Sequence, residues 1–177
     1  NFGIIFGAGE SKIDNTSGVP GLYRTFKSLF PSVDSYMQSV TKQVTKTGYV
    51  KTLGGYRLGV DRNKPYVGVN YIVQGTEGEI VQDAMIRCHY RLATANPNKH
   101  IEAHQSPYIC MQVHDELVFD FPKDTFDEGI LYLLERDMEK SGESVGVETP
   151  VNIEVINHYW SKGIPWRPSS IPTPVTA

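Results

Sequence analysis

The chain has 177 residues, and its content of 40% hydrophobic and 21% charged residues is typical of a globular domain with a sizeable core. It contains neither a signal peptide nor an apolar run of the roughly 18 residues that span a membrane, so we expect no membrane partner. The net charge of −3 gives no overall attraction to nucleic acid, but residues 1–70 hold nine Lys and Arg against four Asp and Glu and can supply phosphate contacts.

The first half of the chain predicts mainly helix. The predicted elements are the end of a helix over 1–9, a turn-rich loop over 14–21, helices over 22–30 and 32–47, and strands over 49–53 and 56–60. The two later helices rest on apolar residues at helical spacing. Gly7 and Gly48 are expected to end helices, and Gly54-Gly55 joins the two strands in a hairpin.

In the second half, helices and strands alternate. The predicted elements are a helix over 76–96, strands over 108–113 and 117–121, a helix over 125–140, a strand over 151–156 and an extended tail over 167–177. Thr76 and Glu79 have the spacing of a capping box, and Gly142 is expected to end the later helix. Cys88 and Cys110 are expected to be buried free thiols. The pattern predicts an α+β fold, an antiparallel sheet with long helices packed on one face.

The segment around residue 115 is the most informative part of the sequence. Two apolar strands flank three consecutive titratable residues, His114, Asp115 and Glu116, which would form the tip of a tight hairpin. A carboxylate held on such a tip can ligate a divalent cation. The same residues also suit an ordinary surface turn, because an Asp side chain bonds nearby backbone N–H groups. Taken alone, the segment leaves both interpretations open.

The string of residues 112–119, Gln-Val-His-Asp-Glu-Leu-Val-Phe, resembles the last conserved motif of family A DNA polymerases, the bacterial DNA polymerase I type. Four other segments resemble this family in the same order. They are residues 1–7, similar to the second half of the fingers helix; 48–57, similar to a strand and turn written GYVxTLxGRR; 70–76, similar to the start of a long palm helix; and 150–155, similar to the last palm strand. The resemblance implies partial fingers over 1–47, a palm with a metal-binding hairpin over 48–166, and a tail over 167–177.

The resemblance also implies roles for single residues. Asp115 would be a metal ligand and, with Glu116, a catalytic carboxylate, although neighbouring strand residues point to opposite faces and Glu116 is expected to act less directly. The other expected roles are nucleotide binding by Phe2, Phe6 and Gly7, and DNA binding by Arg57, Asn70, Gln74 and His114. The amides of Asn70 and Gln74 can bond the acceptors that every base pair presents in the minor groove. Structural alternatives are core packing for Phe2, a helix cap for Asn70 and packing at a strand end for His114.

The chain departs from the family's pattern at several positions. Phe6 stands where the family usually has Tyr, and Tyr66 where it often has a basic residue. Residues 75–79 read Gly-Thr-Glu-Gly-Glu in place of Gly-Thr-Ala-Ala-Asp, and Gly78 weakens a helix there. These departures suggest a divergent, phage-type member of the family.

The resemblance therefore predicts the C-terminal part of a template-directed DNA polymerase, which transfers nucleotides from dNTP to a primer 3′-hydroxyl with two Mg²⁺ ions. The expected partners are primer–template DNA, dNTP and the N-terminal remainder of the polymerase, which would supply the second catalytic Asp. The expected location is the cytoplasm of a bacterium or of a phage-infected host. Two alternatives stay open: a non-catalytic module that binds primer–template DNA or a protein, and a metal-dependent nuclease built on a similar hairpin.

Overall fold

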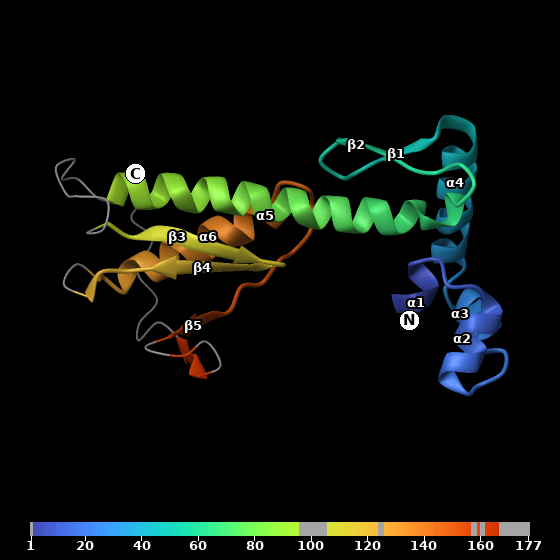
Figure 1. Cartoon of the computed structure of the whole chain (residues 1–177), viewed down its shortest axis with the longest axis horizontal. Coiled ribbons are helices and arrows are strands. Elements are labelled where there is room, and N and C mark those ends of the chain that lie inside the picture. The colour runs from blue at the N-terminus through green and yellow to red at the C-terminus, as the bar shows by residue number, and fades with distance from the viewer. Residues whose placement is uncertain (1, 96–105, 124–125, 157–158, 160–161, 167–177) are drawn as a thin grey trace. The chain divides into compact units, whose positions relative to one another are not determined.

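The computed structural model describes residues 2–95, 106–123, 126–156, 159 and 162–166, so the predicted tail lies outside the described residues (Figure 1). The chain forms two compact units, residues 1–78 and 79–177, and the division between them falls within one helix. No helix in the described part of the chain is long and apolar enough to cross a bilayer.

The first unit is mostly helical. Its elements are α1 (Phe2–Ile5), α2 (Glu10–Ser17), α3 (Leu22–Leu29), α4 (Pro31–Thr47), β1 (Tyr49–Lys51), β2 (Arg57–Gly59), η1 (Pro65–Val67) and the start of α5 (Gly68–Ala95). The predicted helix ends are confirmed, because Gly7 and Gly48 have φ angles of 90° and 75°, which suit glycine. The strands β1 and β2 form the predicted hairpin but are shorter than predicted.

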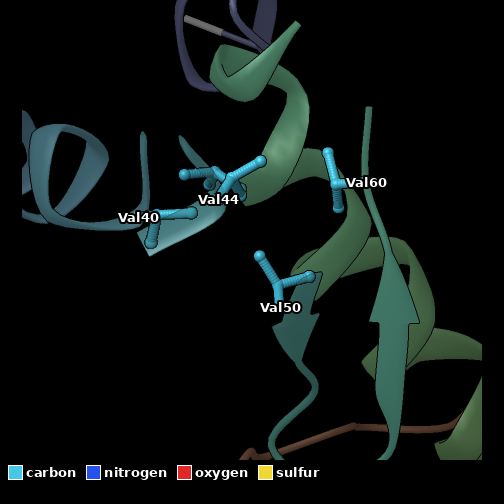
Figure 2. Close-up of a cluster of buried hydrophobic side chains, with 5 residues drawn as sticks. Val40, Val44, Val50 and Val60 are labelled. Carbon is cyan, nitrogen blue, oxygen red and sulfur yellow. The ribbon is translucent and has the colours of Figure 1, made fainter. Parts of the chain in front are cut away.

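A cluster of valines forms the core of the first unit. Val44 of α4 and Val50 of β1 are fully buried. Figure 2 shows them with Val40 and Val60, which come from α4 and from the chain after β2. Burying each such side chain contributes about 1.5–3 kcal/mol. Gly68 lets α5 begin close to this core, because a Cβ on Gly68 would lie only 2.8 Å from a methyl group of Val44.

The predicted loop over 14–21 is wrong in its first residues, which belong to α2. Asp14 lies in this helix, and its carboxylate accepts hydrogen bonds from the backbone N–H groups of Gly21 (2.7 Å) and Tyr23 (3.2 Å). These bonds satisfy donors at the start of α3 that have no partner within the helix. The chain turns instead at Gly18, whose φ is 70°. Asp14 therefore acts through tertiary hydrogen bonds and not as a local turn residue.

The predicted capping box at Thr76 is also wrong, because α5 begins at Gly68 and Thr76 lies inside the helix. The Thr76 hydroxyl donates a hydrogen bond to the carbonyl of Ile72 (2.7 Å) and accepts one from the backbone N–H of Leu53 (3.1 Å). Leu53 belongs to the turn between β1 and β2. Thr76 thus fastens this hairpin to α5.

The second unit contains the remainder of α5, β3 (Tyr108–Val113), β4 (Glu116–Asp120), α6 (Gly129–Glu143), β5 (Ile153–Val155) and β6 (Ile164–Trp166). The α+β class is confirmed. Instead of one continuous sheet, however, the described strands form three two-stranded antiparallel ladders, β1–β2, β3–β4 and β5–β6. Each strand pairs with its neighbour in the sequence, the pairing that short connections favour.

Two helices cover one face of the β3–β4 hairpin, as predicted. Leu117 and Phe119 of β4 pack against Cys88 of α5 and Leu134 of α6, which are almost fully buried. The hairpin lies beside both helices in Figure 1.

An ion pair joins the same two helices. The Arg91 guanidinium of α5 donates two hydrogen bonds, of 2.7 and 3.0 Å, to the Asp137 carboxylate of α6. The bidentate pair fixes the position of one helix on the other.

Helix α6 differs from its prediction at both ends. It begins at Gly129 and continues through Gly142, which was expected to end it. A Cβ on Gly142 would lie 2.5 Å from the carbonyl oxygen of Val147, so glycine is required there by the chain that packs against the helix. On this helix Leu131 is buried, whereas Leu133 is 39% exposed.

The two cysteines have different environments. Cys88 is buried as predicted, and burial raises the pKa of its thiol to about 12. Cys110 is exposed, contrary to the prediction. It lies where the β3–β4 register shifts between Ile109 and Met111, and such an irregularity breaks the in–out alternation on which the prediction relied.

Candidate functional site

The β3–β4 hairpin ends in a loop made of His114 and Asp115. Glu116 had been expected in the loop. It pairs with Val113 across the hairpin and is the first residue of β4. His114 has a φ of 53°, a positive value shared by no other described non-glycine residue. This left-handed conformation lets so short a connection join the two strands.

The backbone of this tip is held in place. Leu117 packs into the core beneath the hairpin, and the side-chain amide of Gln112 donates a hydrogen bond to the carbonyl of His114. Since His114 directly precedes Asp115, both contacts limit how far the Asp115 backbone can move. A carboxylate on a restrained backbone is preorganised for a ligand.

The three titratable side chains at the tip, His114, Asp115 and Glu116, are all exposed. Among the described residues, no three His, Cys, Asp or Glu side chains gather closely enough to hold a metal ion. An exposed carboxylate fits the oxygen preference of Mg²⁺, which usually takes only one or two protein carboxylates. Asp115 therefore fits such an ion as one donor of a larger ligand set.

Two of the predicted DNA-binding residues lie on α5. Gln74 is exposed, whereas Asn70 is half-buried and its amide oxygen has no hydrogen-bond partner among the described residues. A buried acceptor without a partner costs about 1–3 kcal/mol. Both residues follow the first residue of α5, which removes the helix-cap alternative for Asn70.

The predicted nucleotide-binding residues lie at the chain start. Phe2 opens α1, although its side chain is not among those described, and Phe6 is half-buried. Gly7 lies against Tyr66 of η1, because a Cβ on Gly7 would be 2.8 Å from the Tyr66 ring and 3.0 Å from its carbonyl oxygen. Tyr66 thus limits the position of the end of α1, a role that sequence reasoning missed. The sequence offered one signal for Tyr66, because it stands four residues before Asn70, where the family often has a basic residue.

A cavity of about 290 Å³ opens beside Gly7 and Tyr66, between α3 and α4. Its wall includes Lys27, whose ammonium group lies 2.6 Å from the carboxylate of Asp34. The hydrogen bond to Asp34 raises the pKa of Lys27, so the amine stays charged in the neutral range.

Arg57, the remaining predicted DNA-binding residue, lies on β2. Its guanidinium carbon is 4.2 Å from the centre of the Tyr49 ring. The side chain is exposed, and Lys51 lies directly opposite on β1.

The structure therefore separates the predicted residues into two sets. His114, Asp115 and Glu116 are brought together at one hairpin tip in the second unit. The first unit holds the others, Phe2, Phe6, Gly7, Arg57, Asn70 and Gln74.

A sequence profile for the family described as DNA polymerase family A matches residues 1–162, which include both sets. The chain belongs to DNA polymerase family A. It is 28% identical to the DNA polymerase of Mycobacterium phage D29 over 134 residues, 73% of this chain and 20% of that protein. It is 31% identical to the thermostable DNA polymerase I of Thermus thermophilus over 140 residues, 70% of this chain and 16% of that protein. The chain thus spans about a fifth or less of these relatives.

The fold is similar to that of a solved family member. The solved structure is the POL domain of Pol1 from M. smegmatis in complex with DNA primer-template and dNTP. The likeness has a TM-score of 0.64 and 21% sequence identity, and it covers 79% of this chain and 26% of that one. At 21% sequence identity, this likeness shows a shared fold and nothing more.

Proposed function

We propose that this chain is the palm and partial fingers of a template-directed DNA polymerase, which transfers a nucleotide from dNTP to a primer 3′-hydroxyl. The observation that carries the proposal is the exposed carboxylate of Asp115 on a restrained hairpin tip, in a chain that belongs to family A. The relatives named DNA polymerase and the solved domain with primer-template and dNTP support the same substrates.

At the hairpin tip, Asp115 would hold Mg²⁺ together with a second carboxylate from another polymerase segment. Two bound Mg²⁺ ions lower the pKa of an attacking hydroxyl and neutralise charge on a triphosphate. Glu116, on the neighbouring strand position, would contribute less directly, and His114 would contact the primer terminus.

On the first unit, Asn70 and Gln74 would donate hydrogen bonds to the minor groove of the primer–template duplex. Every base pair presents acceptors there, so this contact checks base-pair geometry without reading the sequence. Gln74 is exposed, so its amide N–H₂ group can donate to such an acceptor. Phe2, Phe6 and Gly7 would lie along the incoming dNTP, and Arg57 would contact the DNA.

Primer extension tests the catalytic role of Asp115. The chain is combined with an N-terminal polymerase segment that carries the second Asp, and elongation of a labelled primer is followed with Mg²⁺ and dNTP. Asp115→Asn is expected to slow extension at least about a hundredfold, because a neutral amide replaces a charged metal ligand. Asp120→Asn is the matched control. That carboxylate is exposed on the same hairpin, and among the described residues it accepts a hydrogen bond from the Tyr108 hydroxyl, which an amide oxygen can also accept.

Equal extension by the Asp115→Asn and unaltered chains would refute the catalytic assignment. Mg²⁺-dependent cleavage of DNA by this chain alone would favour the nuclease alternative. Duplex binding without any extension by the combined segments would favour the non-catalytic alternative.

A further inference from the structure

The hairpin of β1 and β2 has one face in the core and one face in solvent. Val50 is fully buried and Leu58 packs on the valine core. The strand alternation places Tyr49, Lys51 and Arg57 together on the other face. The hairpin therefore presents two cations and an aromatic ring on its outer surface.

Lys51 and Arg57 are direct partners in the antiparallel register. Like charges directly opposite each other destabilise a strand pair. Neither side chain forms an ion pair with a described residue, whereas Arg24 and Lys27 of the same unit pair with Glu10 and Asp34. The outer face thus carries an unneutralised pair of positive charges whose repulsion an anion would relieve.

The surroundings of this pair suit a phosphate group. The Arg57 guanidinium lies over the Tyr49 ring, a cation–π contact that helps to hold it in place, and its N–H groups can donate to phosphate oxygens. Gly59 pairs with Tyr49 on the same face, and a Cβ on Gly59 would meet nothing within 4 Å. The bare backbone at Gly59 leaves open space beside the stacked arginine.

The sequence shows where the second cation comes from. The family's pattern GYVxTLxGRR has two adjacent arginines, and this chain has Tyr56 in the place of the first. Lys51 occupies the position that the pattern leaves open. Because Lys51 pairs with Arg57 in the register, a second positive charge lies next to Arg57 on the opposite strand.

We propose that Lys51 and Arg57, with Tyr49 and the bare Gly59, form a binding site for the phosphodiester backbone of duplex DNA. This inference rests on the proposed function and deepens it, since it names the phosphate backbone as the group that Arg57 contacts and adds Lys51 to that contact. The site binds without regard to base sequence, because a phosphate carries no sequence information.

Salt-dependent DNA binding by the full 177-residue chain tests the site. Binding of a fluorescent primer–template duplex is measured by anisotropy over a range of salt concentrations. Lys51→Gln and Arg57→Gln are each expected to reduce the slope of log K against log salt by about 0.9, and equally for duplexes of unrelated sequence. Lys162→Gln is the control. That lysine also lies near an aromatic ring (Tyr159, 5.6 Å), but it belongs to the second unit and not to the β1–β2 hairpin.

A matched pair at Gly59 separates charge from shape. In Gly59→Asp and Gly59→Asn the new side chains have nearly the same size but differ in charge, and the open space at Gly59 accommodates both. Gly59→Asp should bind duplex about tenfold more weakly than Gly59→Asn at low salt, and the difference should shrink as salt screens the charge. Thermal unfolding controls for folding, since Lys51→Gln removes a repulsion and should leave the melting temperature unchanged or higher.

Unchanged salt slopes in Lys51→Gln and Arg57→Gln, or equal affinities of the two Gly59 variants, would overturn the site while leaving the polymerase assignment intact. A failure of the unaltered chain to bind duplex at any salt concentration would instead count against the proposed function itself, and against this site with it.

Discussion

The two hairpins of this chain have the same construction and opposite charge. In β1–β2, the buried Val50 anchors one face, and the exposed positions carry the cations Lys51 and Arg57. In β3–β4, Leu117 packs on the core below, and the exposed tip carries the carboxylate of Asp115. Both hairpins are two-stranded and antiparallel, and helices cover one face of each.

In both hairpins the scaffold sets where a side chain is held, while the exposed residue types set what it can bind. A carboxylate on a short, restrained loop suits a metal ion, and a cation pair on an open strand face suits a phosphate chain. Each hairpin has one covered and one open face, and substitutions on either face test this construction.

The two faces of β3–β4 should differ strongly in the reactivity of their thiols. Cys88 lies under the covered face and its pKa is raised to about 12, whereas Cys110 is exposed on β3. At pH 8, a thiol with that pKa is about 0.01% thiolate, and only the thiolate reacts with alkylating reagents. Mass spectrometry after iodoacetamide treatment should find Cys110 labelled at least a hundredfold faster than Cys88. Similar rates would show that the face is not covered.

The next effect tests the helix pair that supports β3–β4. Arg91→Ala should destabilise the second unit by about 3 kcal/mol, because it leaves the Asp137 carboxylate, whose side chain is 8% exposed, without a partner. Arg87→Ala is the control on the same helix. Its pair with Asp83 is surface-exposed and worth less than about 1 kcal/mol.

Urea unfolding followed by tryptophan fluorescence measures both variants, since both tryptophans of the sequence, Trp160 and Trp166, belong to the second unit. If Arg87→Ala and Arg91→Ala lower the free energy of unfolding equally, the burial of Asp137 does not make the Arg91 ion pair more important for stability than the exposed Arg87 pair.

A smaller effect tests how β1–β2 is seated on α5. A Cβ on Gly75 would lie 2.8 Å from the methyl group of Thr52, so Gly75→Ala should destabilise the first unit by about 1–3 kcal/mol. A Cβ on Gly78 would meet nothing within 4 Å, so Gly78→Ala should stabilise α5 by up to about 1 kcal/mol. Urea unfolding followed by circular dichroism compares the two. Equal effects would mean that the hairpin does not rest on the helix at Gly75.

Much of this architecture was predictable from local pattern. The β3–β4 hairpin and helices α3 and α4 follow from alternation, helical spacing and glycine positions, which act within a few residues. The residues that misled the sequence analysis act over longer distances. Asp14 bonds the start of another helix, Thr76 holds the turn at Leu53, and Gly142 makes room for the chain at Val147. Their residue types suggest a turn, a cap and a stop, and tertiary contacts override these local preferences.

The candidate site shows the same limit. The string around Asp115 was sufficient to predict an exposed carboxylate on a hairpin tip, because the hairpin forms from adjacent residues. The pairing of Lys51 with Arg57 was not predicted, because it depends on the register between two strands. The fit of Gly7 against Tyr66 depends on packing between segments far apart in the sequence.

The role of Asp115 as a metal ligand can be observed in a high-resolution structure of this chain, combined with the N-terminal polymerase segment, with primer–template DNA, dNTP and Mg²⁺. We expect a carboxylate oxygen of Asp115 at about 2.0–2.1 Å from a magnesium ion beside the primer terminus. A fully occupied metal site with the Asp115 side chain outside the coordination shell would contradict the account.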